Sequence, residues 1–246
     1  MRNPLLARAF TKVLVALITC ALSVLSPLTL AETPLLTQPF SASYVLKKRG
    51  FTIGRVEREL NIGDNGLFIF TSVSRPAGIA SLFLSDVIAE QSQWLKQDDN
   101  LQPQHYSYQR SGGALERHVE LRFNWSTRMV TNVINKNPWK MAVPVDVKDK
   151  LLYQLSIMFD LAAGKQELNY TVADGGRLKT YQFARLPAET LMTALGELKT
   201  VKIARHLHDK TVTIWCASDL HYLPVQIEQN DEEGVYKLYI EAVKGL

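Results

Sequence analysis

Cysteine is scarce in this 246-residue chain, which contains only two. Cys20 lies in an apolar segment near the start, so Cys216 has no partner in the rest of the chain. An internal disulfide is therefore excluded there, and stability must come from packing. The single thiol falls in the alternating segment 211–218 and is best interpreted as a small buried apolar side chain.

An excess of charge of one sign is also missing. The chain has 28 Lys and Arg against 24 Asp and Glu, and its pI of about 9.0 looks basic. Three of the basic residues and none of the acidic ones lie in the first 31 residues, which leaves 25 against 24 in the remainder. Nucleic-acid binding needs a basic surplus or a recognisable module, so nucleic acid is not predicted as a partner.

The common catalytic and metal-binding motifs are absent. The chain has no Gly-x-Ser-x-Gly elbow, His-Glu-x-x-His helix, phosphate loop or Cys-x-x-Cys pair. Of the five histidines, only His206 and His208 approach a metal spacing, and the sequence places neither Asp209 nor His221 as a third ligand. We therefore predict no catalytic residue, metal or cofactor.

The first 31 residues have the three parts of a secretory signal peptide. A positive start is followed by the apolar run 13–25 and by the small residues Thr29 and Ala31. The run is shorter than the roughly 20 residues that a membrane span needs. We expect cleavage after Ala31, export to the periplasm, and no transmembrane segment in the mature chain; a retained signal anchor is the alternative.

A single amphipathic helix is predicted, at about 147–163. Asp146 is expected to cap it and Gly164 to end it. One face carries Leu151, Leu152, Leu155, Met158, Phe159 and Ala162. Ile157 and Leu161 form a second strip, which indicates that the helix touches something on two sides, either more core or a lipid or partner.

The rest of the chain reads as a dozen or more short strands separated by turns. In segment 115–123, Leu115, Val119, Leu121 and Phe123 share one inward face, and Arg117 interrupts that apolar series. Sequential hairpins favour an antiparallel meander, and a sheet that long must curl. The fold prediction is mainly β: one domain, 32–246, as an open half-barrel or β-roll around the central helix.

Segment 75–85 breaks the strand pattern. Proline and glycine are followed by Ile79, Leu82 and Phe83. We interpret it as a loop with a short helical turn that plugs the open end of the sheet, or gates a ligand.

Short motifs spread along the chain resemble one exported bacterial family. They are Phe40-x-Ala42-x-Tyr44, Gly54 followed by Arg58 and Leu60, Pro76-x-Gly78-x-Ala80, Glu90-x-Ser92-x-Trp94, Leu101-x-Pro103-x-x-Tyr106, Phe123-Asn124-Trp125, and Trp215-x-x-x-Asp219-Leu220-x-Tyr222-Leu223-Pro224. In this order they are similar to domain of unknown function 3108. The resemblance implies a Gram-negative cell-envelope protein without an established activity. It also implies a curled sheet around a helix, reminiscent of periplasmic lipoprotein-carrier half-barrels.

Export, the helix and the apolar loop together predict a non-enzymatic periplasmic protein. It would bind an apolar ligand, such as an acyl chain or a lipoprotein, or an envelope partner, in the concavity of the sheet. The candidate ligand-binding residues are Tyr44, Ile79, Leu82, Phe83, Trp94, Ile157, Phe159 and Leu161. One alternative is an envelope hydrolase acting on glycan or peptide through carboxylates or the His206/His208 pair. Another is an assembly factor that binds through a sheet edge near Tyr222-Leu223-Pro224.

Overall fold

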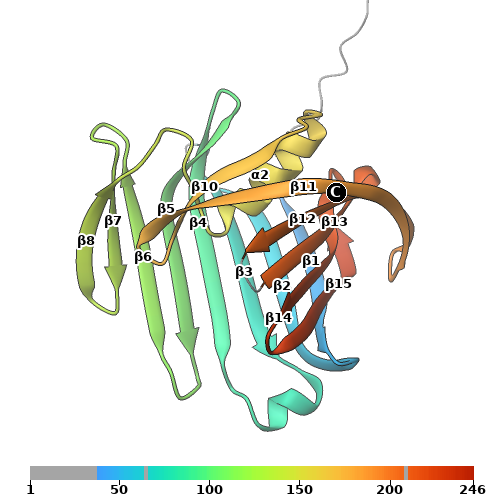
Figure 1. Ribbon diagram of the computed structural model, residues 1–246. Coiled ribbons are helices and arrows are strands. Elements are labelled where there is room, and N and C mark those ends of the chain that lie inside the picture. Colours follow the sequence, from blue (N-terminus) through green and yellow to red (C-terminus); the bar gives the residue numbers. More distant parts are fainter. Residues whose placement is uncertain (1–37, 64–65, 208–209) are drawn as a thin grey trace, which may run out of the picture. The chain divides into compact units, whose positions relative to one another are not determined.

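The computed structural model of the protein describes residues 38–63, 66–207 and 210–246. Fifteen strands of this part of the chain form one curled sheet (Figure 1). The strands are β1 (Phe40–Lys48), β2 (Phe51–Ile62), β3 (Phe68–Pro76), β4 (Val87–Gln97), β5 (Asn100–Ser111), β6 (Arg117–Asn124), β7 (Met129–Ile134), β8 (Asn137–Ala142), β9 (Lys148–Asp149), β10 (Leu168–Asp174), β11 (Arg177–Thr193), β12 (Gly196–Leu207), β13 (Lys210–Ala217), β14 (Leu223–Asp231) and β15 (Gly234–Lys244). The helical elements are α2 (Leu152–Ala162) and the 3-10 helices η2 (Gly78–Leu82) and η3 (Ser218–Leu220). The predicted leader 1–31 lies outside the described residues.

The strand order confirms the predicted antiparallel meander. From β1 in the middle, successive hairpins lead outward to the edge strand β8. The chain then crosses to the short strand β9 at the other edge and continues through α2 to β10. Successive strands return from β10 to β15, which pairs with β1. Within the described residues, β9 and β10 form the only parallel pair of strands. The β1–β15 pairing joins the two halves of the meander into one sheet.

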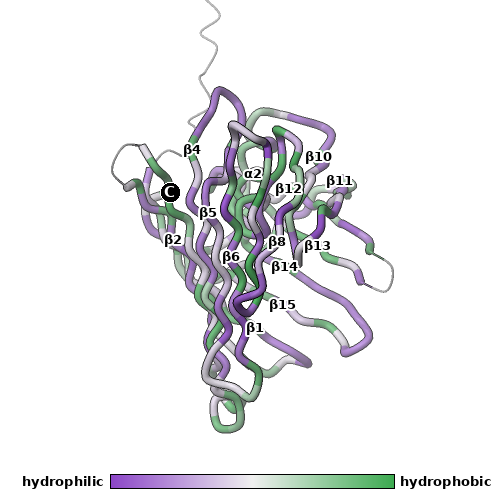
Figure 2. Tube along the Cα trace, turned by 90° about the vertical axis from the view of Figure 1, so that its left-hand side faces the viewer, coloured by the Kyte–Doolittle hydropathy of each residue, from purple (hydrophilic) through white to green (hydrophobic). Residues whose placement is uncertain are grey.

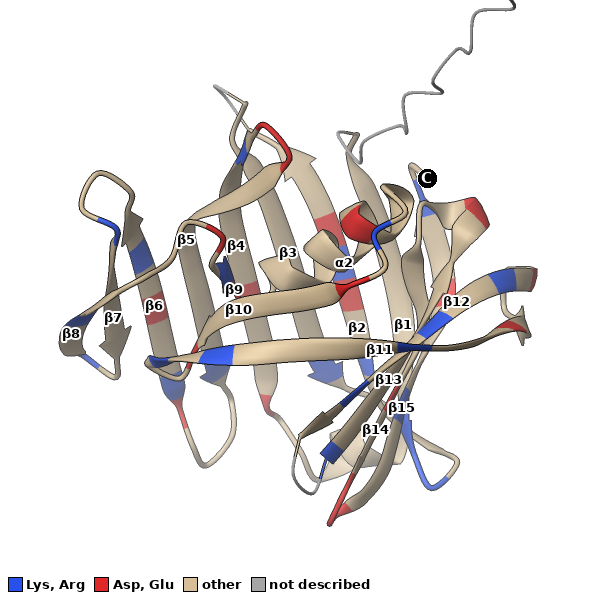
Figure 3. Ribbon diagram, turned by 45° about the horizontal axis from the view of Figure 1, so that its top comes forward, with Lys and Arg blue, Asp and Glu red and all other residues tan. Residues whose placement is uncertain are grey.

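The helix α2 lies on the concave side and is covered from two directions (Figure 3). Leu152, Leu155 and Met158 pack into a cluster with side chains of β1–β7. Ile157 and Leu161 pack into a second cluster with β10–β13. The predicted contact on two sides is confirmed, and both strips are covered by the chain itself.

The helix is shorter than predicted, because it begins at Leu152 and not near residue 147. Lys148 and Asp149 form β9, which pairs with Val172 and Ala173. Asp149 Oδ1 accepts hydrogen bonds from the backbone N–H groups of Leu151 (2.9 Å) and Leu152 (2.8 Å). The cap is therefore Asp149 and not Asp146. A carboxylate there satisfies N–H groups that have no partner within the helix.

Strand β11 extends to Thr193, through a segment where the sequence predicted no strand. Its first part pairs with β10 and its second part with β12. The register shifts between Leu186 and Glu189, where Pro187 lies. A bulge tolerates proline because the ladder is already interrupted there.

The edge strand β8 meets the β10–β11 turn through Trp139 and Gly176. The glycine has φ +78°, and a Cβ atom there would lie 2.0 Å from Trp139 Cζ2. No larger residue fits without moving the indole. This contact brings the β10–β11 turn over the concave face of the first half of the sheet.

Candidate functional site

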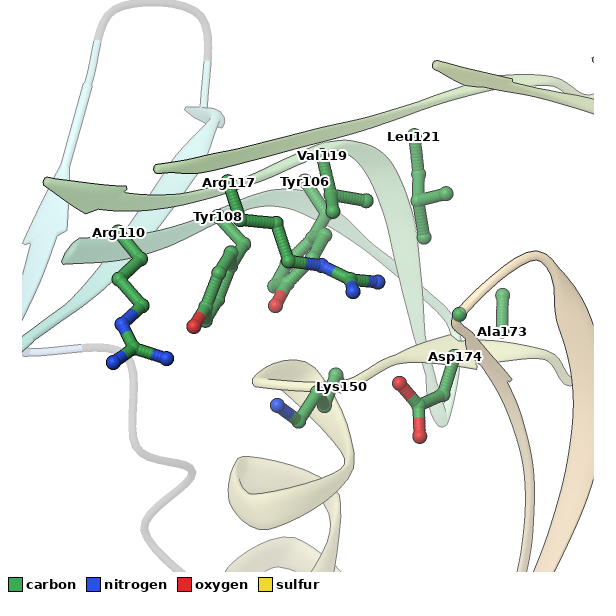
Figure 4. Close-up of a pocket in the computed structure, with 10 residues that line it drawn as sticks. Tyr106, Tyr108, Arg110, Arg117, Val119, Leu121, Lys150, Ala173 and Asp174 are labelled. Carbon is green, nitrogen blue, oxygen red and sulfur yellow. The ribbon is translucent and has the colours of Figure 1, made fainter. Parts of the chain in front are cut away.

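A cavity of about 300 Å³ lies on the concave side, between the β5–β6 hairpin and the β10–β11 turn (Figure 4). We call it the cleft. Its lining consists of Tyr106, Tyr108 and Arg110 from β5, Arg117, Val119 and Leu121 from β6, Lys150 before α2, Ala173 and Asp174 at the end of β10, and Gly175 in the β10–β11 turn. Segments far apart in the sequence therefore build it together.

The pairing of β5 with β6 explains why these side chains share one face. Arg110 lies opposite Arg117, Tyr108 opposite Val119, and Tyr106 opposite Leu121. Side chains two residues apart on a strand point to the same side. The inward series of β6 thus presents an arginine at its start and two buried apolar residues after it.

Cations predominate in the lining. Arg110 Nε donates to Asp86 Oδ1 at 2.7 Å. Lys150 Nζ lies 3.9 Å from Glu90 Oε1 and 5.4 Å from the ring centroid of Tyr108. Arg117 is exposed and makes no ion pair with any described residue. In Figure 4 the side chains of Arg117 and Asp174 point into the space between β6 and β10, and that of Lys150 points toward Tyr108.

Among the described residues, Asp174 is the only carboxylate in the lining, and it already accepts hydrogen bonds. Its Oδ2 accepts hydrogen bonds from Lys179 Nζ (2.7 Å) and from the Tyr181 hydroxyl (3.1 Å). Burial opposes its ionisation, but these hydrogen bonds and the charge of Lys150 hold the pKa of Asp174 below its usual value. It is ionised near neutral pH, and much of its charge is offset within the chain.

The Tyr106 hydroxyl forms the inner wall of the cleft. It donates to Glu90 Oε1 at 2.6 Å. Burial, and then the charge of Glu90, raise the pKa of Tyr106 far above its ordinary value. The phenol therefore stays neutral and acts as a hydrogen-bonding group, with no role as an acid or base near neutral pH.

The structure does not bring the eight predicted ligand-binding residues together. Tyr44, Trp94, Ile157 and Leu161 are buried in the core, and Phe159 is partly buried against Trp94. The loop that carries Ile79, Leu82 and Phe83 forms the predicted helical turn, η2, but at the opposite end of the sheet from α2 (Figure 1). All three are exposed there and plug no opening. Contact of any of the eight with a ligand remains a prediction.

The remaining candidates have structural partners. His206 Nδ1 lies 3.0 Å from Thr211 Oγ1, whereas His208 and Asp209 lie outside the described residues. Within the described ranges, no three His, Cys, Asp or Glu side chains are grouped as metal ligands, and no helix could span a membrane. Cys216 is buried, as predicted, and burial raises the pKa of its thiol.

The sequence did not identify the cleft residues as a site, with one partial exception. Arg117 was recognisable as a charged residue in an inward-facing apolar series. Arg110, Lys150 and Asp174 carried no such signal, because their convergence depends on the crossing of β10–β11 over the sheet.

Comparison with known proteins gives a family and a fold. The family model described as "Protein of unknown function (DUF3108)" matches residues 40–241. No curated protein matches the chain. Among solved structures, the chain is similar to a beta-barrel-like protein of domain of unknown function DUF1849 from Brucella abortus, with a TM-score of 0.54 and 11% identity over 85% of this chain and 98% of that one. At this identity the likeness concerns the fold alone. Since the family model covers most of the chain, the protein belongs to the DUF3108 family of proteins of unknown function.

Proposed function

We propose that this protein is an exported, non-enzymatic binding protein of the periplasm. Its ligand would be an amphiphile with an anionic head group, such as an acyl chain with a carboxylate or a lipid-derived segment of a lipoprotein. The cleft would hold the head group. Export is inferred from the leader 1–31 and from the family resemblance.

The convergence of cations carries the proposal. Arg110, Arg117 and Lys150 line the cleft, and the one lining carboxylate is bonded to Lys179 and Tyr181. Arg110 is paired with Asp86, and Lys150 Nζ lies 3.9 Å from Glu90 Oε1, so Arg117 carries the positive charge that no ion pair with a described residue offsets. An anion bound in the cleft would offset that charge. Guanidinium groups suit carboxylate and phosphate because two N–H donors can bind two oxygens at once. Arg117, which has no ion pair with a described residue, is the best candidate for that contact.

The apolar part of the lining supports an acyl chain behind the head group. Val119, Leu121 and Ala173 are buried and face the cleft beside the two tyrosine rings. A volume of about 300 Å³ is at the lower limit of small-molecule sites. The cleft therefore fits a small ligand, or one end of a longer one.

The two rival functions have less support. Glycoside hydrolysis commonly uses a pair of carboxylates. Among the described residues that line the cleft, Asp174 is the only one with a carboxylate. The prediction that Tyr222-Leu223-Pro224 lies at a sheet edge is wrong. Pro224 lies on β14, an interior strand, opposite Cys216 at a register shift. A bulge explains the proline as well as an edge would.

The test compares two arginines of the same strand. Arg117→Gln is expected to weaken binding of a fluorescent long-chain fatty acid about tenfold, because a charge-assisted contact is lost. Arg122→Gln is the matched control, since Arg122 faces away from the cleft and pairs with Glu120 at 2.8 Å. It is expected to leave affinity unchanged. The uncharged long-chain alcohol should bind both variants equally.

Fatty-acid titration by fluorescence measures these affinities. Failure of the wild-type protein to bind the fatty acid would contradict the proposal. Equal losses in Arg117→Gln and Arg122→Gln would contradict it as well, because the effect would then reflect net charge and not the cleft.

A further inference from the structure

Half of the exposed large apolar side chains gather at one end of the sheet. Six of the twelve that the described residues contain lie in three neighbouring turns. They are Phe51 (68% exposed), Ile79 (62%), Leu82 (76%), Phe83 (82%), Leu84 (53%) and Leu115 (68%). We call this surface the apolar tip. In Figure 2 it appears as green at the lower end of the molecule.

Hydrogen bonds and one close contact hold the three turns together. The Ala77 N–H donates to the Ile53 carbonyl at 3.2 Å, which ties η2 to β2. Gly78 has φ +64° and lies so close to Thr52 that a Cβ atom would be 2.7 Å from its carbonyl oxygen. The Ser85 hydroxyl donates to the Gly112 carbonyl in the β5–β6 turn. The tip is thus a built surface and not a set of independent loops.

The charges around the tip are arranged unevenly. Residues 77–85 carry no charge, whereas Lys47 and Lys48 end β1 and Arg49 lies in the adjoining β1–β2 turn (Figure 3). Lys48 Nζ donates a hydrogen bond to the Tyr236 hydroxyl at 2.6 Å and lies 4.0 Å from Glu233 Oε2. Arg49 is exposed and has no ion pair with the described residues. Apolar side chains with flanking cations are typical of surfaces that enter the headgroup region of anionic bilayers.

We propose that the apolar tip docks the protein on the surface of a bilayer that contains anionic lipids. Phe83 and Leu82, the most exposed side chains of the tip, would enter the interface, and Arg49 would contact lipid phosphate. Asp86, which follows the tip, accepts a hydrogen bond from Arg110 of the cleft. Docking would therefore place the cleft near the source of amphiphiles. The inference does not depend on the cleft binding a ligand.

Tryptophan reporters in the intact protein test where the bilayer is touched. In Phe83→Trp, the added emission is expected to shift to shorter wavelength on vesicles of phosphatidylcholine with phosphatidylglycerol, and to be quenched by brominated lipids. Met192→Trp is the matched control, since Met192 is 78% exposed on β11, away from the tip. Its emission should not change. The emission of the native tryptophans is subtracted with the wild-type protein.

Two further variants separate the apolar from the electrostatic contribution. Leu82→Ser is expected to weaken vesicle binding about tenfold on both lipid compositions. Arg49→Gln should weaken it about fivefold on vesicles with phosphatidylglycerol and not on phosphatidylcholine alone. Both residues are exposed, so the melting temperature should stay within error of wild type.

Several results would overturn the proposal. They are an unshifted Phe83→Trp emission, equal shifts in both reporters, or unchanged vesicle binding in Leu82→Ser. A stoichiometric protein partner that shields the indole of the Phe83→Trp variant and excludes vesicles would also overturn it, because the tip would then be a protein interface.

Discussion

Replacing Trp94 with alanine is expected to lower the free energy of unfolding by about 3–5 kcal/mol, the range for a large aromatic removed from a core. The indole is fully buried, stacks on Phe68 with ring centroids 4.3 Å apart, and meets the Phe159 ring edge-on at 6.3 Å. It therefore fixes α2 to the sheet. Urea unfolding followed by circular dichroism measures the change.

Trp125 is the matched control for this substitution. It lies in the turn between β6 and β7, is partly buried, and donates Nε1–H to the Pro103 carbonyl at 2.8 Å. Trp125→Ala is expected to lower the free energy of unfolding by roughly half as much or less, because the partly buried indole of Trp125 buries less apolar surface on folding. If Trp94→Ala kept wild-type stability and lost a bound ligand, Trp94 would be a ligand-lining residue, as the sequence suggested, and not a packing residue.

Replacing Asp149 with alanine should lower the free energy of unfolding by roughly 2–4 kcal/mol at neutral pH. The carboxylate is fully buried, caps α2 through two backbone N–H groups, and accepts the Ser92 hydroxyl at 2.6 Å. Alanine leaves these donors buried without a partner, at about 1–3 kcal/mol each, offset in part by removal of a buried charge. Asp149→Asn retains the acceptor oxygen and should stay within about 1 kcal/mol of wild type or exceed it.

Titration of the Asp149 carboxylate should also make the stability of the protein depend on pH. Burial raises the pKa of Asp149 from its ordinary value of 3.8 to about 6, against the opposing hydrogen bonds from Ser92 and the backbone. The folded state therefore holds the proton more tightly than the unfolded state. The stabilisation from this proton is complete below about pH 4 and is lost as pH rises through about 6.

This contribution can be isolated by comparison with Asp149→Asn, which cannot titrate. From pH 4 to pH 7, the wild-type free energy of unfolding should fall by up to about 3 kcal/mol relative to the asparagine variant. Chemical denaturation across that range measures the difference. Parallel curves for the two proteins would show that Asp149 does not control the dependence.

Much of the fold was predictable, because its signals are local. Alternation in segments such as 40–47 and 115–123 indicated strands, and the apolar spacing of Leu152, Leu155 and Met158 indicated the helix. The second strip, Ile157 and Leu161, correctly indicated contact on two sides. Each of these features depends on residues within a few positions of one another, which is where periodicity is informative.

The parts that were missed depend on long-range pairing. Asp149 could not be recognised as the cap, because β9 exists only through its pairing with β10. The extension of β11 past Pro187 depends on a bulge opposite β12. The cleft is the clearest case, since Arg117 and Asp174 line one cavity only because Gly176 lets the β10–β11 turn approach Trp139. Conversely, Ile79, Leu82 and Phe83 were singled out as an apolar loop with a helical turn, but the predicted plug was wrong, because all three side chains are exposed.

The central claim is that the cleft holds an anionic amphiphile. Native mass spectrometry with lipid extraction, on protein purified from a periplasmic fraction without detergent, tests it most directly. We expect a stoichiometric acidic amphiphile on the wild-type protein and on Arg122→Gln, and its loss from Arg117→Gln. A clean unliganded mass for the wild-type protein, or an uncharged ligand that Arg117→Gln retains, would contradict the claim.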